Sequence, residues 1–182
     1  VLSRIQINDP FTIEANETRQ IPVSFDLPAV VPVTRGKTRV WIATGLDIKN
    51  AVDPTDKDFI EIKPTALTSN VLKAVSSIGF RLRKVDTEQA PNYLRNQTPV
   101  VQEYEFTPTT STFRRYLDEL EIIFLQQTPT SVEILIQVDR RARGLGGFLS
   151  ESLNMDESFV RLTIHAHDNI PAILEQTIQR YM

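Results

Sequence analysis

The stretch EILIQVDRRARGLGGFLSE, residues 133–151, begins as a strand and ends as a charged turn. Apolar residues alternate with polar ones over residues 132–139, the period of two expected when one face of a strand is buried. Three arginines then follow within four residues: Arg140, Arg141 and Arg143. The glycines after them favour a turn, because glycine accepts backbone conformations with positive φ. Guanidinium groups match carboxylates and phosphates, so we expect this cluster to lock two parts of the protein together or to bind an anionic partner.

The overall composition is that of an ordinary soluble protein. Of the 182 residues, 41% are hydrophobic and 24% are charged, which is enough apolar material for a core. The net charge of −3 gives no field that would attract nucleic acid, whose binding domains are usually basic. No apolar run approaches the roughly 18 residues of a membrane helix, so no membrane span is expected.

The chain contains no cysteine. Disulfides, zinc–thiolate sites and a thiol nucleophile are therefore excluded as a group. The absence of cysteine also fits a reducing compartment, and we expect the protein to be cytoplasmic.

Residues 1–63 have the pattern of strands joined by turns that contain proline. We expect strands at four places: residues 4–7, 21–25, 37–49 and 59–62. A β-sandwich usually has about seven strands, so four are too few to close one. Because the sequence opens on Val1 and its first residues already alternate like a strand, we expect an incomplete first domain. Its missing strands should come from a removed N-terminus or from another chain.

A helix and a second group of strands follow. Apolar residues recur at spacings of three and four between Thr65 and Ile78, which predicts an amphipathic helix that ends at Gly79 and forms a hinge between two domains. Strands are then expected at residues 80–85, 100–106, 117–125, 132–139 and 159–164, before a closing helix with Pro171 in its first turn. Strands without intervening helices favour an all-β sandwich with short helices over a parallel α/β sheet.

Several acidic residues could pair with the arginines. The predicted ion-pair cluster combines the three arginines with Asp139, Asp118, Glu119, Glu121 and Asp47. Breaking a buried ion pair typically costs about 3 to 5 kcal/mol, whereas an exposed pair contributes about 0 to 1 kcal/mol. A buried cluster would therefore act as a latch between domains. The alternative interpretations are a solvated turn and an exposed anion site.

No pattern in the chain is typical of catalysis or of cofactor binding. No serine lies in GxSxG, and no GK[ST] follows the glycine-rich turn as it would in a phosphate loop. His165 and His167 could share one face of a strand beside Asp168, the arrangement that a metal enzyme would require. Arg161 and Thr163 on the same face indicate a wet surface, so we predict no metal, no cofactor and no catalytic residue.

Long motifs cover much of the chain. They are GFRLRKVDTEQAP at residues 79–91, QEYEF at 102–106, YLDELEIIF at 116–124 and VDRRARGLGGFLSE at 138–151. These motifs resemble the bacterial sporulation-control protein family of the stage-zero M type. The stretch VTRGKTRVWIATGLDIKNAVDPTDKDFIEI at residues 33–62 is similar to the end of that family's first domain.

The resemblance implies an arrestin-like pair of β-sandwich domains that meet at an interface with buried polar and charged groups. It assigns residues 1–63 to the C-terminal part of the first sandwich, residues 64–79 to a linker helix, and residues 80–182 to the second sandwich with its closing helix. The implied function is that of a non-enzymatic regulatory or scaffolding protein that binds other proteins. Homo-oligomers are possible through open sheet edges. The alternative is a module that binds anions or phosphopeptides through Arg140, Arg141 and Arg143.

Overall fold

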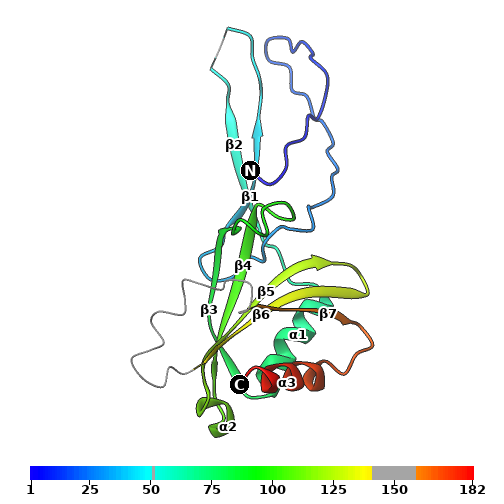
Figure 1. Ribbon diagram of the computed structural model, residues 1–182. Coiled ribbons are helices and arrows are strands. Elements are labelled where there is room, and N and C mark those ends of the chain that lie inside the picture. Colours follow the sequence, from blue (N-terminus) through cyan, green and yellow to red (C-terminus); the bar gives the residue numbers. More distant parts are fainter. Residues whose placement is uncertain (51, 141–158) are drawn as a thin grey trace.

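The structure is a computed structural model that describes residues 1–50, 52–140 and 159–182, and this part of the chain contains two separate antiparallel sheets. The first is a hairpin of β1 (Val40–Gly45) and β2 (Thr55–Ile60). The second has five strands and lies at the other end of an elongated molecule (Figure 1). The mostly β fold with a few short helices is therefore confirmed.

The second sheet is a meander in which each strand pairs with the next one along the chain. Its strands are β3 (Phe80–Gln89), β4 (Val100–Pro108), β5 (Leu117–Gln127), β6 (Ser131–Arg140) and β7 (Phe159–His165), in that spatial order. All neighbours are antiparallel, and a short turn at residues 128–130 joins β5 to β6. All five strands predicted after the first helix are present, because alternation with one buried face marks them in the sequence.

Two of the strands predicted in the N-terminal region are absent. Residues 4–7 and 21–25 form no ladder, so those two predictions are wrong, and the strand predicted at residues 37–49 is confined to β1. Their apolar residues stay at the surface: Ile5 is 50% exposed and Val23 is 46% exposed. Alternation predicts which face of a strand would be buried, but a strand forms only where a neighbour supplies hydrogen bonds.

One face of the five-stranded sheet carries the main core. Helices α1 (Ala66–Ser77) and α3 (Ile170–Arg180) pack on this face (Figure 1). The fully buried residues come from both helices and from β4 to β7, and they include Val71, Val75, Leu174, Ile178, Tyr104, Phe106, Leu120, Ile122, Ile134, Ile136 and Ile164. The predicted linker helix is thus part of this core. Within the described residues, helices cover the face on which a sandwich would place a second sheet.

The helix ends follow the local sequence. The Thr65 hydroxyl accepts a hydrogen bond from the Thr68 N–H and begins α1, and Gly79 follows its last turn with φ of +109°. Asn169 caps α3 in the same way, with Pro171 in the first turn as predicted. A four-residue helix that the sequence did not indicate, α2 (Ser111–Arg114), lies between β4 and β5. In the described part of the chain, no helix is long and apolar enough to cross a membrane.

The opposite face of the sheet has a smaller apolar cluster. Val101, Ile123 and Leu135 project from three adjacent strands, and Ala90 and Leu94 cover them from the loop after β3. The cluster occupies only part of this face, and charged side chains occupy the rest.

We predict that Gly79→Ala destabilises the fold by about 2 kcal/mol or more. A side chain at this position would have to adopt positive φ, and its Cβ would lie 2.5 Å from Cγ2 of Thr110. Urea denaturation measures the loss. Gly45→Ala is the matched control, since a Cβ there would meet its nearest neighbour at an ordinary 3.6 Å. Equal stability of the two variants would contradict the prediction.

Candidate functional site

The predicted arginine cluster falls largely outside the described residues. Arg141 and Arg143 lie outside them, and Arg140 is described only as the last residue of β6, with its backbone opposite Leu117. The predicted latch and the predicted anion site therefore stay predictions.

The structure brings some of the predicted acidic partners together. Glu119 lies directly opposite Asp139 across β5 and β6, and Glu121 lies two residues further along the same face of β5. Asp118 is exposed at the start of β5. Asp47 is exposed beyond the end of β1, in the hairpin at the other end of the molecule (Figure 1). Asp47 is thus not part of the acidic group on the sheet.

Two basic residues of β3 that were not predicted as site residues pair with this acidic group. Nη2 of Arg83 lies 2.7 Å from a carboxylate oxygen of Glu105 and 2.8 Å from one of Glu119. Nζ of Lys84 lies 3.3 Å from the other oxygen of Glu105 and also pairs with Asp86. These residues form a charged face on the sheet, opposite the main core.

A β-bulge explains why the adjacent residues Arg83 and Lys84 both pair with Glu105 on one face of the sheet. Leu82 lies opposite Phe106 and Lys84 lies opposite Glu105, so Arg83 is the extra residue of β3. A bulge re-aims side chains that strict alternation would place on opposite faces. No pattern of period two could have indicated that Arg83 and Lys84 both reach Glu105.

Among the described carboxyl groups, Glu121 has the pKa most strongly raised by its surroundings. It is half-buried, and burial together with repulsion from Glu103, Glu119, Glu105 and Asp139 raises its pKa to about 7. Glu105 behaves differently: burial alone would raise its pKa, but hydrogen bonds from Arg83 and Lys84 hold that pKa below its usual value.

Carboxylate oxygens of Glu105, Glu119 and Glu121 all lie within 4.8 Å of one another, which is close enough to share a cation. A cation is already there, because the Arg83 guanidinium pairs with two of the three. The trio is therefore explained as part of an ion-pair network.

The two histidines lie at the edge of the five-stranded sheet that β7 forms. His165 ends β7, and its exposed ring stacks on that of His167 with centroids 5.6 Å apart. Asp168 accepts a hydrogen bond from the His165 backbone N–H and holds the turn. Within the described residues, no third ligand joins this pair in a group that could hold a metal.

A polar junction connects the N-terminal segment to the five-stranded sheet. Its centre is the buried side chain of Gln102 on β4. The Gln102 carbonyl oxygen accepts from the Val33 N–H at 2.9 Å, and its amide donates to the Val33 carbonyl at 2.8 Å. Tyr104 also donates to Gln102, and the hydroxyls of Thr38 and Thr87 complete the network, 2.8 Å from each other.

The Gln102 side chain thus pairs with Val33 as a neighbouring strand would, through one donor and one acceptor. Every member of the network is uncharged, and burial raises the pKa of Tyr104 to about 12. This junction could not be predicted from the sequence, because a glutamine in a strand usually marks a solvated face.

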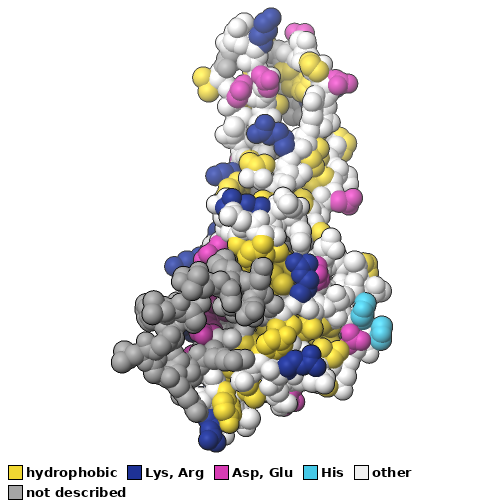
Figure 2. All heavy atoms as spheres, viewed as in Figure 1, with side chains coloured by type: hydrophobic (Ala, Val, Ile, Leu, Met, Phe, Trp, Pro, Cys, Tyr) yellow, Lys and Arg dark blue, Asp and Glu magenta, His cyan; other side chains and the backbone are white. Residues whose placement is uncertain are grey.

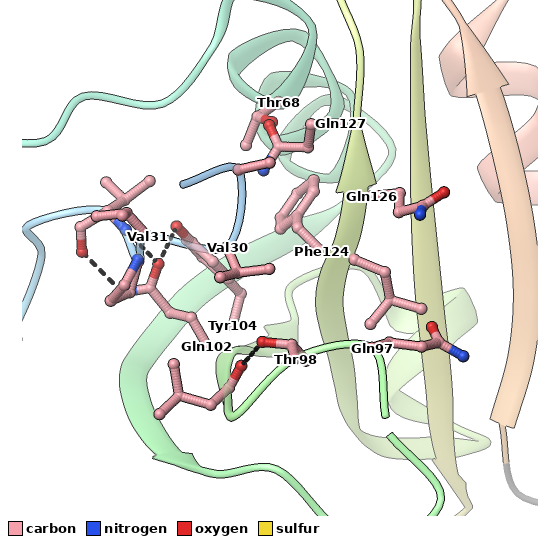
Figure 3. Close-up of a pocket in the computed structure, with 15 residues that line it drawn as sticks. Val30, Val31, Thr68, Gln97, Thr98, Gln102, Tyr104, Phe124, Gln126 and Gln127 are labelled. Carbon is pink, nitrogen blue, oxygen red and sulfur yellow. Dashed lines mark hydrogen bonds between the residues drawn. The ribbon is translucent and has the colours of Figure 1, made fainter. Parts of the chain in front are cut away.

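A pocket of about 160 Å³ lies beside the junction (Figure 3). Its walls are the segment 29–33, the ends of β4 and β5, and Thr68 of α1. Gln102 and Tyr104 line one side, while Phe124, Gln126 and Gln127 line the other (Figure 3). All of its lining residues are uncharged.

Comparison with known proteins gives a consistent result. Residues 1–142 match the family model described as SpoOM protein. The chain is 40% identical over 181 residues to the sporulation-control protein spo0M of Bacillus subtilis, an alignment that covers 97% of this chain and 69% of that protein. The crystal structure of Spo0M from Bacillus subtilis superposes with a TM-score of 0.74 at 40% identity, over 87% of this chain and 66% of the crystallised chain.

We predict that Glu121→Gln stabilises the protein at pH 8 and not at pH 5. Because folding raises the pKa of Glu121 from 4.5 to about 7, the folded chain holds a proton that the unfolded chain has released, so stability falls as pH rises through this window. Glutamine does not ionise, so the stability of the variant does not fall in this pH window. Solvent screening limits the gain at pH 8 to about 1 kcal/mol.

Denaturation midpoints at the two pH values measure this difference. Glu175→Gln, on the exposed side of α3, is the control and should change neither midpoint. A gain for Glu121→Gln that is equal at pH 5 and pH 8 would contradict the assignment.

We predict that Gln102→Ala destabilises the protein by about 2 to 4 kcal/mol, since it leaves the Val33 peptide groups and the Tyr104 hydroxyl without their partner. Hydrogen exchange should rise at residues 29–38 before it rises in the sheet. Gln176→Ala, at an exposed position of α3, is the control. Unchanged exchange at residues 29–38 would show that the junction does not depend on Gln102.

Proposed function

The chain belongs to the SpoOM protein family, and from this we propose that it is a non-enzymatic regulator that acts by binding other proteins. Its relative in Bacillus subtilis is named a sporulation-control protein, and a regulatory role in that process is what we propose for this chain. The contact surface that we propose is the hairpin β1–β2.

The observation that carries this proposal is the exposed aromatic pair of the hairpin. Trp41 and Phe59 lie directly opposite each other on the two strands, with ring centroids 6.1 Å apart. Trp41 is 46% exposed and Phe59 is 67% exposed. Nζ of Lys57 lies 4.7 Å from the centroid of the Trp41 ring and borders the pair with a positive charge. Exposed aromatics beside a cation are typical of residues that anchor protein interfaces.

The hairpin also extends away from the main core (Figure 1). A two-stranded sheet is only marginally stable by itself in water, so its outer edges favour further pairing. Figure 2 shows apolar side chains at the surface of this end of the molecule. Among the exposed apolar residues of the N-terminal segment are Ile5, Ile7, Ile13, Val23, Phe25 and Leu27, all at least 39% exposed. A surface of this kind is expected to be covered by a protein.

The sequence of β2 disfavours pairing with a second copy of itself. Antiparallel pairing centred on Lys57 would place lysine against lysine and Asp56 against Asp58. A register centred on Asp58 would place aspartate against aspartate. Like charges opposite each other are destabilising, so a different partner fits this edge better.

We predict that Phe59→Asp reduces partner capture at least about tenfold, because it replaces an interface anchor with a charge. The chain is used as bait in an extract of a bacterium that carries it. Tyr116→Asp, a change at an exposed aromatic outside the hairpin, should leave capture unchanged.

Trp41 provides an independent readout, because it is the only tryptophan of the chain. Its emission should shift to shorter wavelength when the captured fraction is added, since binding removes water from the ring. Equal capture by both variants, together with unchanged Trp41 emission, would contradict the hairpin as the contact surface.

A further inference from the structure

The two strands of the hairpin differ in charge. At its centre β2 carries Asp56, Lys57 and Asp58, whereas none of the six residues of β1 is charged. In the described part of the chain, β1 pairs only with β2, so its outer edge has no ladder partner. Figure 1 shows this edge at the end of the molecule that lies away from the five-stranded sheet. An edge strand without charge, proline or bulge is open to pairing with another strand.

The direction of the backbone groups of β1 follows from its pairing with β2. The Leu46 N–H donates to the Pro54 carbonyl, which continues the ladder one residue beyond Gly45. In an antiparallel ladder, alternate residues turn their N–H and C=O groups toward the partner. The even-numbered residues of β1 therefore bond to β2, and Trp41, Ala43 and Gly45 direct these groups outward. A strand that joins this edge must bond at the odd-numbered positions.

Exposed residues of opposite charge flank β1 at equal distances from Ala43. Arg39 precedes Ala43 by four residues, and Asp47 follows it by four. Arg39 donates to two backbone carbonyls through Nη1, but among the described residues neither Arg39 nor Asp47 forms an ion pair. An antiparallel pair of two β1 strands centred on Ala43 places each Arg39 opposite Asp47 of the second copy. It also places Trp41 opposite Gly45, so the odd-numbered positions meet.

Neighbouring registers lose this match of charges. A pair centred on Thr44 sets Arg39 beside the turn that holds Lys49, and one centred on Ile42 sets it opposite an uncharged residue. In the register centred on Ala43, Lys49 lies in a turn outside the paired stretch. Opposite charges across a ladder are favourable and like charges are unfavourable. Each exposed pair adds little affinity, but two equivalent pairs favour one register over its neighbours.

We propose that two copies of this chain associate through the outer edges of their β1 strands, antiparallel and centred on Ala43. The product is a four-stranded sheet in the order β2, β1, β1, β2. Trp41 and Phe59 lie on one face of each hairpin, and this pairing puts both aromatic pairs on the same face of the joined sheet. The outer edge of β3 is a poorer site, because a bulge interrupts it.

This inference goes beyond the proposed function, because the dimer requires no other protein. Its consequence for that function is that a dimer presents two aromatic pairs to a partner at once. The paired stretch of each copy is only six residues long, so the association is weak. We expect a dissociation constant between about 10 μM and about 1 mM.

Charge reversal at the two flanking positions tests the register. Arg39→Asp and Asp47→Arg each place like charges opposite each other, so either variant alone should dimerise about tenfold more weakly than the parent chain. A mixture of the two variants is complementary again, because one copy then carries two acidic residues and the other two basic ones. Sedimentation equilibrium should show that the mixture regains the parent affinity, which also shows that both variants fold. Glu175→Arg, at an exposed position of α3, is the charge control and should dimerise like the parent.

Disulfide formation locates the contact. The chain has no cysteine, so single cysteines can be placed at Val40 and Leu46, which lie opposite each other in the proposed register. A mixture of Val40→Cys and Leu46→Cys should give a crosslinked dimer, because opposite residues of a ladder lie within disulfide distance. Val40→Cys alone should give none, since its two cysteines would lie six residues apart along the strands, roughly 20 Å.

Four results would overturn the proposal. They are the absence of a dimer below about 1 mM, charge variants that dimerise as well as the parent, a mixture of them that associates no better than either alone, and crosslinking that does not require both cysteine variants. Slow hydrogen exchange of the Ala43 and Gly45 amides in dilute solution would also overturn it, because another segment of the chain, such as residues 21–25, would then cover the edge.

The dimer and the proposed partner contact fail separately. The dimer is measured with the purified chain alone, without any extract. Partner capture is measured at about 1 μM chain, where a dimer of this affinity is dissociated. Loss of capture with Phe59→Asp therefore says nothing about the β1 edge, and absence of a dimer leaves the aromatic pair to be judged by its own experiment.

Discussion

The arrangement of this molecule depends on one side-chain amide. Gln102 presents to Val33 the donor and acceptor that a neighbouring strand would present, and so it ties the N-terminal segment to a sheet whose core is elsewhere. Because the amide is buried, the alternative to these bonds is a set of unpaired polar groups rather than a return to water. The junction is therefore more specific than an apolar contact of the same size. The hairpin that follows takes its direction from this junction and from the bonds between Thr34 and Ile62.

The five-stranded sheet has two faces with different roles. One face buries α1 and α3 and supplies the main core. The other combines a small apolar cluster with a charged face in which Arg83 and Lys84 neutralise only some of the acidic residues. Burial, together with the excess negative charge around it, raises the pKa of Glu121 to about 7. A bulge in β3 aims Arg83 at its partners.

Much of the C-terminal part could be predicted from the sequence, because each strand there alternates about a buried face and each helix has a capping residue and an apolar stripe. The strands predicted at residues 4–7 and 21–25 had the same alternation but no neighbour, and alternation does not supply one. Glu119, Glu121 and Asp139 were predicted as partners of the arginines in the opening motif, and they lie on one face of the sheet. Arg83, which pairs with Glu119 from a bulge that has no periodic signature, was not predicted. The Gln102 junction depends on residues 69 positions apart, a contact that no local pattern contains. The arginines of the opening motif, and the arrestin-like pairing of two sandwiches, stay predictions.

Together these features describe a member of the SpoOM protein family that we propose to be a regulator, with the hairpin, on one side of a polar junction, as its proposed contact. The most direct test of this account is the distance between the hairpin and the sheet in solution. The chain has no cysteine, so Thr44→Cys and Thr163→Cys place two spin labels at exposed positions without other sites of attachment. Pulsed electron spin resonance should give one narrow distance distribution that broadens when Gln102 is replaced by alanine. A broad distribution in the parent chain, or a narrow one that persists without Gln102, would contradict the account.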